Sequence, residues 1–365
     1  MPFSPKFTIT PGITKSLMRI EAVKAVFDSL PVTPRVLRSL RETARLLSVH
    51  YSTAIEGNRL TRQEVGEFFR KAAKPKTRDE REIQAYSVAL DYMESLAGKN
   101  TPITEELAQK IHALVEGATP SRIKATPWRD GQNAIYDSAS GAIIYMPPEA
   151  RDVPELMRDL FLWLQNAVQE LPVPLVTGLL HYQFVTIHPF YDGNGRTARL
   201  VSTLVMRRYG YGLKGVYALE EYYARDLPAY YAALAAHPHH NYYFGRAEAD
   251  LTAWLEYFCA GAADAFEKVK KNADAERERG GTDRSAQLRE LDSRQRVALT
   301  LFTRQRNATA AELGEVLGLS ARNAAELCRK WVASGFLAVT DSSKRARAYG
   351  LAPEFSALAD EAPER

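Results

Sequence analysis

Apolar residues recur every three or four positions along most of the chain, which predicts a mainly α-helical protein. Helical stretches of this kind cover residues 10–50, 79–98, 104–116, 156–168, 175–187 and 247–279. Pro31 and Pro34 interrupt the first stretch, while Pro172 and Pro174 precede the stretch that begins near 175. Because proline is tolerated at a helix start but not in a helix interior, these positions mark helix boundaries.

Two short runs depart from the helical pattern. Residues 132–136 and 142–146 are β-type runs on either side of a Ser- and Gly-containing turn at 137–141. Strand-like runs around a five-residue turn predict a β-hairpin.

A helix boundary is also expected around Gly57. Thr61 and Glu64 form a T-x-x-E capping box before an apolar run, and Gly57 suits the position just after a helix. Ser52 and Glu56 are four residues apart, so they share one face of the helix that ends there.

The pattern changes again after the Gly-Gly-Thr-Asp segment at 280–283, which predicts a linker over 280–285. A helix is expected over 286–305, a capping box at Thr309 and Glu312, a helix from Ser320 to Ser334, and strands over 337–350. This order resembles a winged helix-turn-helix. We therefore predict an N-terminal helical region (1–100), a helical core (101–279), the linker, and a winged-helix domain (286–365).

Charge adds one feature to this C-terminal region. Residues 284–350 contain 12 Lys or Arg and 6 Asp or Glu, a net charge of +6. This excess suits contact with DNA phosphates. The candidate phosphate-binding residues are Arg322, Arg329, Lys330, Lys344, Arg345 and Arg347. Winged helices also serve as protein-docking or dimer elements, so DNA, another protein and a second copy of the chain all stay open as partners.

Composition places few further limits on function. The 365 residues suggest two or three domains, and 45% hydrophobic residues is ordinary for a globular protein. The net charge of +4 is too small to require a nucleic-acid or membrane partner. Cys259 and Cys328 lack metal-ligand spacing, so we expect two buried thiols. The sequence has neither a signal-peptide h-region nor a run of 18 apolar residues, so we predict a cytoplasmic location without a membrane partner.

Most of the candidate chemistry lies in residues 188–199, which read HPFYDGNGRTAR. His188 can accept a hydroxyl proton near neutral pH. Gly193 and Gly195 allow a turn that aims backbone N–H groups at an anion, and a helix is expected to follow. Asp192 just before this turn is suited to hold Mg²⁺ beside phosphates.

Two arginines complete this phosphate-binding set. Arg196 and Arg199 lie three residues apart in the first turns of the expected helix, so they share a face. The planar guanidinium can bind phosphate through two hydrogen bonds. The chain contains no G-x-x-x-x-G-K-[ST] motif, which excludes an ordinary P-loop nucleotide site.

Residues 188–199 match at every position the Fic family signature H-P-F-x-[DE]-G-N-G-R-x-x-R. The resemblance implies a helical enzyme that transfers AMP from ATP to a Ser, Thr or Tyr hydroxyl of a protein, with the chain itself among the targets. His188 would then be the general base and Asp192 the Mg²⁺ ligand, while Phe190 would anchor the loop in the core.

The resemblance also implies phosphate-binding roles. Asn194 would orient the α-phosphate, and Arg199 would bind the γ-phosphate. The backbone at Gly193 and Gly195 and the side chain of Arg196 would line the phosphate site.

Residues 52–58 resemble the Fic inhibitory motif [ST]-x-x-x-E-[GN]-N, with matches at Ser52, Glu56, Gly57 and Asn58. The resemblance implies that Glu56 pairs with Arg199 and so keeps the α-phosphate out of line for attack. By itself, the spacing also fits a solvated helix end.

Fic proteins carry a flap that pairs with the backbone of the target, and the predicted hairpin suits this role. Ile143, Ile144 and Tyr145 are the candidates for the pairing edge, although a hairpin that only covers the core fits the pattern as well. Tyr222 and Tyr230 are candidates for the nucleotide pocket, although tyrosines at helical spacing often belong to a core. His237, His239 and His240 look like a metal cluster, but a solvated loop is expected there.

Three functions are therefore open. The leading hypothesis is an ATP- and Mg²⁺-dependent protein adenylyltransferase that is autoinhibited by Glu56. A second is the reverse activity, in which Glu56 directs a water to remove AMP from a modified protein. A third is a DNA-binding regulator that acts through the winged helix.

Overall fold

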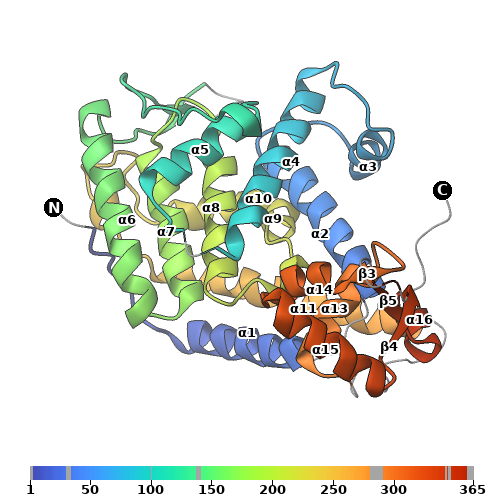
Figure 1. Cartoon of the computed structure of the whole chain (residues 1–365). Helices are drawn as coiled ribbons and strands as arrows, with labels where there is room; N and C mark the ends of the chain where they lie inside the picture. Colours follow the sequence, from blue (N-terminus) through green and yellow to red (C-terminus); the bar gives the residue numbers. More distant parts are fainter. Residues whose placement is uncertain are drawn as a thin grey trace. The chain divides into compact units, whose positions relative to one another are not determined.

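A computed structural model describes residues 3–29, 34–99, 101–136, 141–279, 291–341, 343 and 347–359. The described residues are mostly helical (Figure 1), so the predicted mainly α class is confirmed. They divide into two compact units. The first unit comprises Met1–Asp28 and Glu42–Lys270, and the second comprises Ser29–Arg41 and Lys271–Arg365.

Most helices lie in the first unit. In chain order they are α1 (Pro11–Ser29), α2 (Pro34–Ile55), α3 (Arg62–Arg70), α4 (Arg78–Ala97), α5 (Glu105–Val115), α6 (Val153–Glu170), α7 (Val173–Ile187), α8 (Asn194–Arg208), α9 (Glu220–Arg225), α10 (Leu227–Leu234) and α11 (Thr252–Arg279). Short 3-10 turns occur at η1 (Pro120–Arg122), η2 (Ala150–Asp152), η3 (Leu213–Gly215) and η4 (Arg246–Glu248). The chain passes from one unit to the other at the last residue of α1, within α2 and within α11.

Helices α7 and α8 form the centre of the first unit. Almost every residue of α7 is buried, as expected for a helix that is apolar on all sides. Helix α8 packs against α7, α4 and α5, so its side chains are also largely buried. The segment that joins these two helices, 188–193, is therefore fixed at both ends by the core.

The helix boundary predicted near Gly57 is present. Helix α2 ends at Ile55, and Gly57 has a φ of +94°, a conformation that glycine adopts without steric cost. Thr61 and Glu64 form the predicted capping box at the start of α3. Helix α2 therefore ends in a tight turn directly after Glu56.

The predicted hairpin is also present. Strands β1 (Ile135–Tyr136) and β2 (Ile143–Tyr145) are antiparallel, with Ile135 opposite Tyr145. Residues 137–140 of the predicted turn lie outside the described residues. On the other edge, just after β2, Met146 forms a parallel bridge with Asn241.

The second unit contains α13 (Ser293–Phe302), α14 (Ala310–Leu317), α15 (Ala321–Ala333) and α16 (Pro353–Ala359), with β3 (Ala308–Thr309), β4 (Leu337–Asp341) and β5 (Ala348–Leu351). The strands form an antiparallel sheet in the order β3-β5-β4. The capping box at Thr309 and Glu312 and the Ser320 cap of α15 are present as predicted. The sequence pattern did not indicate β3.

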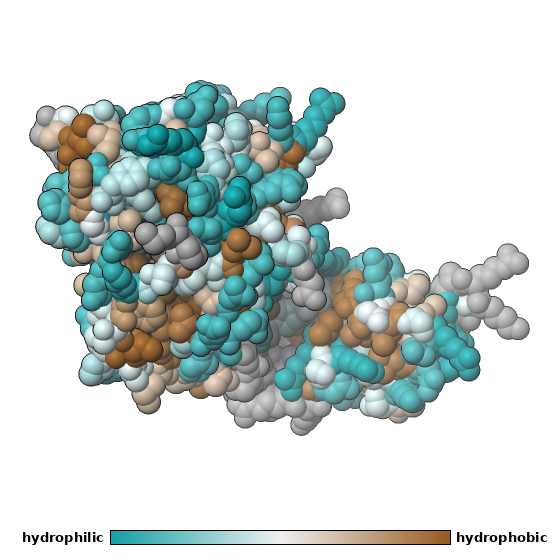
Figure 2. Space-filling model, turned by 90° about the vertical axis from the view of Figure 1, so that its left-hand side faces the viewer, coloured by the Kyte–Doolittle hydropathy of each residue, from teal (hydrophilic) through white to brown (hydrophobic). Residues whose placement is uncertain are grey.

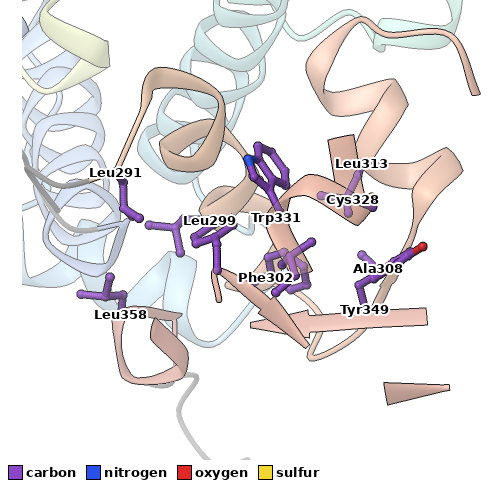
Figure 3. Packing of buried hydrophobic residues seen from close by; sticks show 12 residues of the cluster. Leu291, Leu299, Phe302, Ala308, Leu313, Cys328, Trp331, Tyr349 and Leu358 are labelled. Carbon is purple, nitrogen blue, oxygen red and sulfur yellow. The ribbon is translucent and has the colours of Figure 1, made fainter. Parts of the chain in front are cut away.

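A separate hydrophobic core holds the second unit together. It includes Leu299, Phe302, Trp331 and Phe336, with Trp331 and Phe336 edge to face at 5.2 Å between ring centroids. Figure 3 shows Cys328 among these residues. Cys259 in the first unit and Cys328 are both free and buried, as predicted.

The unit boundaries differ from the predicted domain boundaries. Residues 42–100 share one unit with the predicted core, since α4 packs directly on α5 and α8. Residues 29–41 group with the C-terminal unit. The predicted linker at 280–285 lies outside the described residues.

On the face drawn in Figure 2, hydrophobic patches lie between areas of hydrophilic residues. Within the described ranges, no helix is both long and apolar enough to cross a membrane.

Candidate functional site

His188 lies directly after α7 in a left-handed conformation, with φ 53° and ψ 58°. Non-glycine residues rarely adopt this conformation, and it is often found at functional sites. The ring Nδ1 lies 3.2 Å from the Val185 carbonyl oxygen. Because a carbonyl only accepts hydrogen bonds, Nδ1 carries the proton and Nε2 is left with a lone pair. Burial lowers the pKa of His188, which favours this neutral form.

Arg129 fixes the backbone around His188, a role that the sequence analysis did not identify. Its Nε donates to the carbonyl of His188 at 2.9 Å, and its backbone N donates to the carbonyl of Pro189 at 2.9 Å. Its guanidinium also donates to Gly131 and Pro148 carbonyls. The buried Arg129 thus ties the loop before the hairpin to the segment that carries His188.

Phe190 anchors the loop, as predicted. Its ring stacks on His112 at 3.6 Å between centroids and lies 5.1 Å from that of Trp128. The side chain of Asn194 accepts from the Phe190 N–H at 2.9 Å and donates to the Phe190 carbonyl at 2.8 Å. The amide predicted to orient a phosphate is therefore used inside the loop, which leaves the backbone N–H groups to face a ligand.

These N–H groups belong to the first turn of α8. Gly193 has a φ of +71° and donates to Asp192 Oδ1 at 2.6 Å. The first intrahelical bond runs from Thr197 N to the Gly193 carbonyl at 2.9 Å. The N–H groups of Asn194, Gly195 and Arg196 therefore have no helical acceptor, the usual condition for anion binding at a helix N-terminus.

Arg196 is the first arginine of this turn. Its Nη2 lies 3.4 Å from both Asp192 Oδ1 and Glu116 Oε1. Glu116 was not predicted from the sequence, because it lies at the end of α5 and looks like an ordinary exposed acid there. A Cβ at Gly193 would come within 2.7 Å of Glu116 Oε1, so this position requires glycine.

Arg199 joins α8 to the end of α2. Its Nε donates to Ser52 Oγ at 2.8 Å, and its Nη2 donates to the Ser52 carbonyl at 2.8 Å and to Glu56 Oε1 at 2.7 Å. Arg199 is only 2% exposed, whereas the side chain of Glu56 is 30% exposed, so the ion pair joins a buried guanidinium to a partly exposed carboxylate. Ser52 and Glu56 do share one helix face, and both contact the second arginine of residues 188–199.

The Glu56 carboxylate also lies against the α8 turn. A Cβ at Gly195 would overlap Glu56 Oε1 and would lie 3.0 Å from Arg199 Nη1. The carboxylate therefore occupies the space beside the first turn of α8, where an anion bound to this helix end would lie.

Asn58 fixes the chain that follows Glu56. Its Nδ2 donates to the Asp79 carbonyl and to Glu82 Oε2, both at 3.0 Å, and its Oδ1 accepts from Leu60 N at 3.1 Å. These bonds connect the end of α2 to the start of α4.

Residues 102–206 match the Fic/DOC family. These residues form a Fic domain. The chain is 28% identical over 201 residues to the protein adenylyltransferase Fic of Drosophila willistoni and 30% identical over 202 residues to that of Aedes aegypti. Each alignment covers 54% of this chain but only 39% of the relative, so the chain spans about two fifths of these relatives' length.

Solved structures support the same fold. A Fic family protein from Desulfovibrio desulfuricans aligns over all of both chains, with a TM-score of 0.61 and 23% sequence identity. Fic-1 from C. elegans aligns with 72% of this chain and 73% of its own, with a TM-score of 0.58 and 22% identity.

The two tyrosines predicted for a nucleotide pocket, Tyr222 and Tyr230, lie in different surroundings. Tyr230 is buried, and its hydroxyl lies 2.9 Å from His181 Nε2. Tyr222 instead packs on α11, where its ring lies 5.3 Å from that of Tyr257 and close to Gly261. The neighbouring Tyr231 donates to the Ile55 carbonyl at 3.3 Å, directly before Glu56.

The three candidate flap residues of the Fic domain also differ. Ile143 and Ile144 are 47% and 45% exposed. Tyr145 is buried, and its hydroxyl donates to the Thr186 carbonyl at 2.8 Å. The side chain of Tyr145 therefore fixes the hairpin to α7, and its backbone pairs with Ile135 of β1, so Tyr145 supports the hairpin rather than a bound target.

The remaining candidates lie outside the Fic domain. His237 and His239 stack at 5.4 Å, but the described residues contain no group of three or more His, Cys, Asp or Glu placed to hold a metal. Arg322, Arg329, Lys330 and Arg347 are exposed, while Lys344 and Arg345 lie outside the described residues. DNA binding by this unit stays a prediction.

Proposed function

We propose that the chain transfers AMP from ATP to a Ser, Thr or Tyr hydroxyl of a protein, and that Glu56 restrains this activity. The observation that carries the proposal is the contact of Glu56 with Arg199 beside the α8 turn. A carboxylate held by the arginine of a phosphate-binding turn acts as a competitor of the phosphate. The names of the relatives, protein adenylyltransferase Fic, support the reaction class.

The phosphates of ATP would bind at the N-terminus of α8. The unpaired N–H groups of Asn194, Gly195 and Arg196 favour an anion, and the helix dipole adds to their effect. Arg199 is placed to bind the terminal phosphate once Glu56 has moved away. The high charge of the triphosphate would offset the cost of separating this ion pair.

The residues also fit Mg²⁺. The side chain of Asp192 is 65% exposed beside the α8 turn. A single carboxylate together with substrate phosphates is the usual way in which proteins bind Mg²⁺. Bound there, Mg²⁺ would neutralise phosphate charge.

His188 supplies the base for the transfer. The target hydroxyl gives its proton to Nε2 of His188, and its oxygen forms a bond to the α-phosphorus. The bond from the α-phosphorus to the bridging oxygen of the β-phosphate breaks, and pyrophosphate leaves. Such a reaction depends mainly on positioning and on stabilisation of charge.

The flap places the target. Met146 donates to the His240 carbonyl and accepts from Tyr242 N, on the edge of β2 that faces away from β1. Because backbone polar groups alternate between the two edges of a strand, we infer that the N–H and C=O of Ile144 face this same edge. An extended segment of the target would add to this edge. Two residues after Ile144, the same edge of the hairpin is already paired, because Met146 forms a bridge with Asn241.

Mass spectrometry of the Glu56→Gly variant tests the proposal. After incubation with Mg·ATP and a cell lysate, we expect AMP on Ser, Thr or Tyr side chains of the variant or of lysate proteins. The matched variant Glu56→Gly/His188→Ala should form at least about 10²-fold less product, because it lacks the general base. An unmodified lysate and unmodified protein would refute the proposal.

A target that has been modified in this experiment also shows whether the chain catalyses the reverse activity, removal of AMP. Wild-type protein is added to a target that the Glu56→Gly variant has modified. If wild type removes AMP and Glu56→Gly does not, then Glu56 directs a water and the net reaction is removal. If neither protein removes AMP, the inhibitory role of Glu56 is supported.

A further inference from the structure

Three polar side chains at intervals of four residues follow one face of α2 and of the turn directly after it. They are Ser48, Ser52 and Glu56. Residues at this spacing lie above one another on successive helical turns, each about 5.4 Å from the next. Ser52 and Glu56 contact Arg199, whereas Ser48 contacts a second acid, Glu220. Glu220 therefore lies one turn of α2 behind Arg199.

Glu220, the first residue of α9, is 3% exposed. Its Oε1 accepts hydrogen bonds from Ser48 Oγ at 2.9 Å and from Tyr86 Oη at 3.2 Å. Two donors on one oxygen suit an ionised carboxylate, which only accepts. Burial raises the pKa of Glu220, while a hydrogen bond from its own backbone N–H, and then Ser48, Arg199 and Tyr86, act in the opposite direction.

Arg199 and Glu220 also line the same small cavity of about 10 Å³. Tyr217 and Tyr223 line this cavity too, and their hydroxyl groups have no hydrogen-bond partner among the described residues. Both charged groups are therefore shielded from bulk water in one pocket, where their attraction is strong.

His181 also lines this cavity, but its ring does not carry a charge that could balance Arg199. His181 Nδ1 lies 3.2 Å from Ser202 Oγ, which itself donates to the Ala198 carbonyl, so Nδ1 donates. His181 Nε2 then accepts from Tyr230 Oη at 2.9 Å. Burial lowers the pKa of His181 to about 3, so the ring is neutral at physiological pH. Glu56 and Glu220 are thus the acids placed to balance Arg199.

We infer that Glu220 is a second, permanent counter-ion of Arg199, which keeps the buried guanidinium balanced and in position when Glu56 leaves. A buried charge that loses its partner is strongly destabilising. With Glu220 in place, release of Glu56 does not leave Arg199 unpaired, so the inhibited and open states can both be folded and stable. This inference deepens the proposed function, since it rests on the inhibitory role of Glu56.

A double-mutant cycle with Glu56→Gln and Glu220→Gln tests this role, because glutamine keeps the shape and removes the charge. Each single variant retains one acid beside Arg199, and the double variant retains none. We expect the thermal midpoint of the double variant to fall by at least about 4 °C more than the sum of the single shifts. If the shift of the double variant equals the sum of the two single shifts to within about 2 °C, the inference is overturned.

Two controls make the result specific. Glu94→Gln removes an acid that pairs with Arg207, and its shift should add to that of Glu56→Gln. In an Arg199→Met background, Glu220→Gln should lose its coupling to Glu56→Gln, because the shared charge is absent. Coupling that persists without Arg199 would also overturn the inference.

Ligand binding gives a readout that a merely structural role would not change. Mg·ATP supplies a new anion for Arg199, so it should raise the midpoint of the double variant more than that of Glu56→Gln. An equal rise in both variants would count against Glu220 as a counter-ion. None of these measurements involves AMP transfer, so failure of the transferase proposal would appear separately in the labelling of Glu56→Gly.

Discussion

At the scale of single residues, Arg199 receives contacts from one distant segment. Ser52 lies near the end of α2 and Glu56 directly after it, while Arg199 lies on α8, more than 140 positions later in the chain. The sequence predicted this pairing only through the resemblance of both segments to Fic motifs. Arg129, Glu116 and Glu220 were missed because their contacts form between segments that no local pattern connects.

The pH dependence of transfer is a prediction at this scale. Burial lowers the pKa of His188, so the neutral base persists to lower pH than for an exposed histidine. Removal of Glu56 takes away a negative charge that raises this pKa, so the pKa falls further in Glu56→Gly. We expect the kcat/KM of that variant to decrease only below about pH 6.5. A decrease that already begins above this pH would contradict the tautomer and the burial described for His188.

Gly195→Ala is a second prediction for a single residue. The new Cβ would overlap Glu56 Oε1 and crowd Arg199, so we expect a loss of about 1–3 kcal/mol in the free energy of unfolding. AMP transfer should also be lost, since the same space is needed by phosphate. Gly98→Ala is the matched control, because nothing lies within 4 Å of its Cβ position and φ is −88°. Urea unfolding of both variants gives the comparison, and equal losses would contradict the close contact of Glu56 with α8.

At the scale of elements, the end of α2 determines where Glu56 lies. The sequence predicted this end well, because Gly57 and the capping box of α3 are local signals that depend on the backbone alone. The bonds from Asn58 to the start of α4 were not predictable, since they depend on how the two helices pack. The position of Glu56 thus depends on local signals, which are Gly57 and the capping box of α3, and on the tertiary hydrogen bonds of Asn58.

Asn58→Ala tests the hydrogen bonds that join Asn58 to the start of α4. Loss of its bonds to Asp79 and Glu82 should cost about 1–3 kcal/mol and loosen the turn that carries Glu56. We therefore expect AMP transfer to rise above the wild-type rate when measured with α-labelled ATP. In the Glu56→Gly background the same change should not raise transfer further. An unchanged rate in Asn58→Ala would show that Asn58 has no part in restraint.

The flap gives a second prediction at this scale. Ile144→Pro removes an N–H that points away from β1, so the target should no longer add to the edge of β2. Labelling of target proteins by Glu56→Gly should decrease at least about tenfold, while the affinity for ATP stays unchanged. Ile144→Ala keeps the N–H and serves as the control. Equal labelling by both variants would show that the flap takes no part in binding the target.

At the scale of the whole molecule, the chain consists of two units with separate cores. The sequence predicted the helical class, and the composition change near 280 marked where the second pattern begins. It did not predict that residues 42–100 share a unit with residues 102–206 or that 29–41 group with the C-terminal unit. Membership of a unit depends on contacts such as that of α4 with α8, which periodicity does not reveal.

Calorimetry tests this division. Since each unit has its own hydrophobic core, we expect two unfolding transitions rather than one. Mg·ATP should raise the midpoint of only one of them in the Glu56→Gly variant, because Arg199 and the α8 turn lie in the first unit. A single transition, or equal shifts in both, would contradict independent cores.

The central claim is that Glu56 restrains an AMP transferase, and parallel labelling by wild type and Glu56→Gly tests it most directly. Both proteins are incubated at the same concentration of Mg·ATP that is labelled at either the α- or the γ-phosphate. We predict label on protein from α-labelled ATP alone, with an initial rate for Glu56→Gly at least about 10²-fold above wild type. Equal rates for the two proteins, or transfer of label from the γ-phosphate, would contradict the claim.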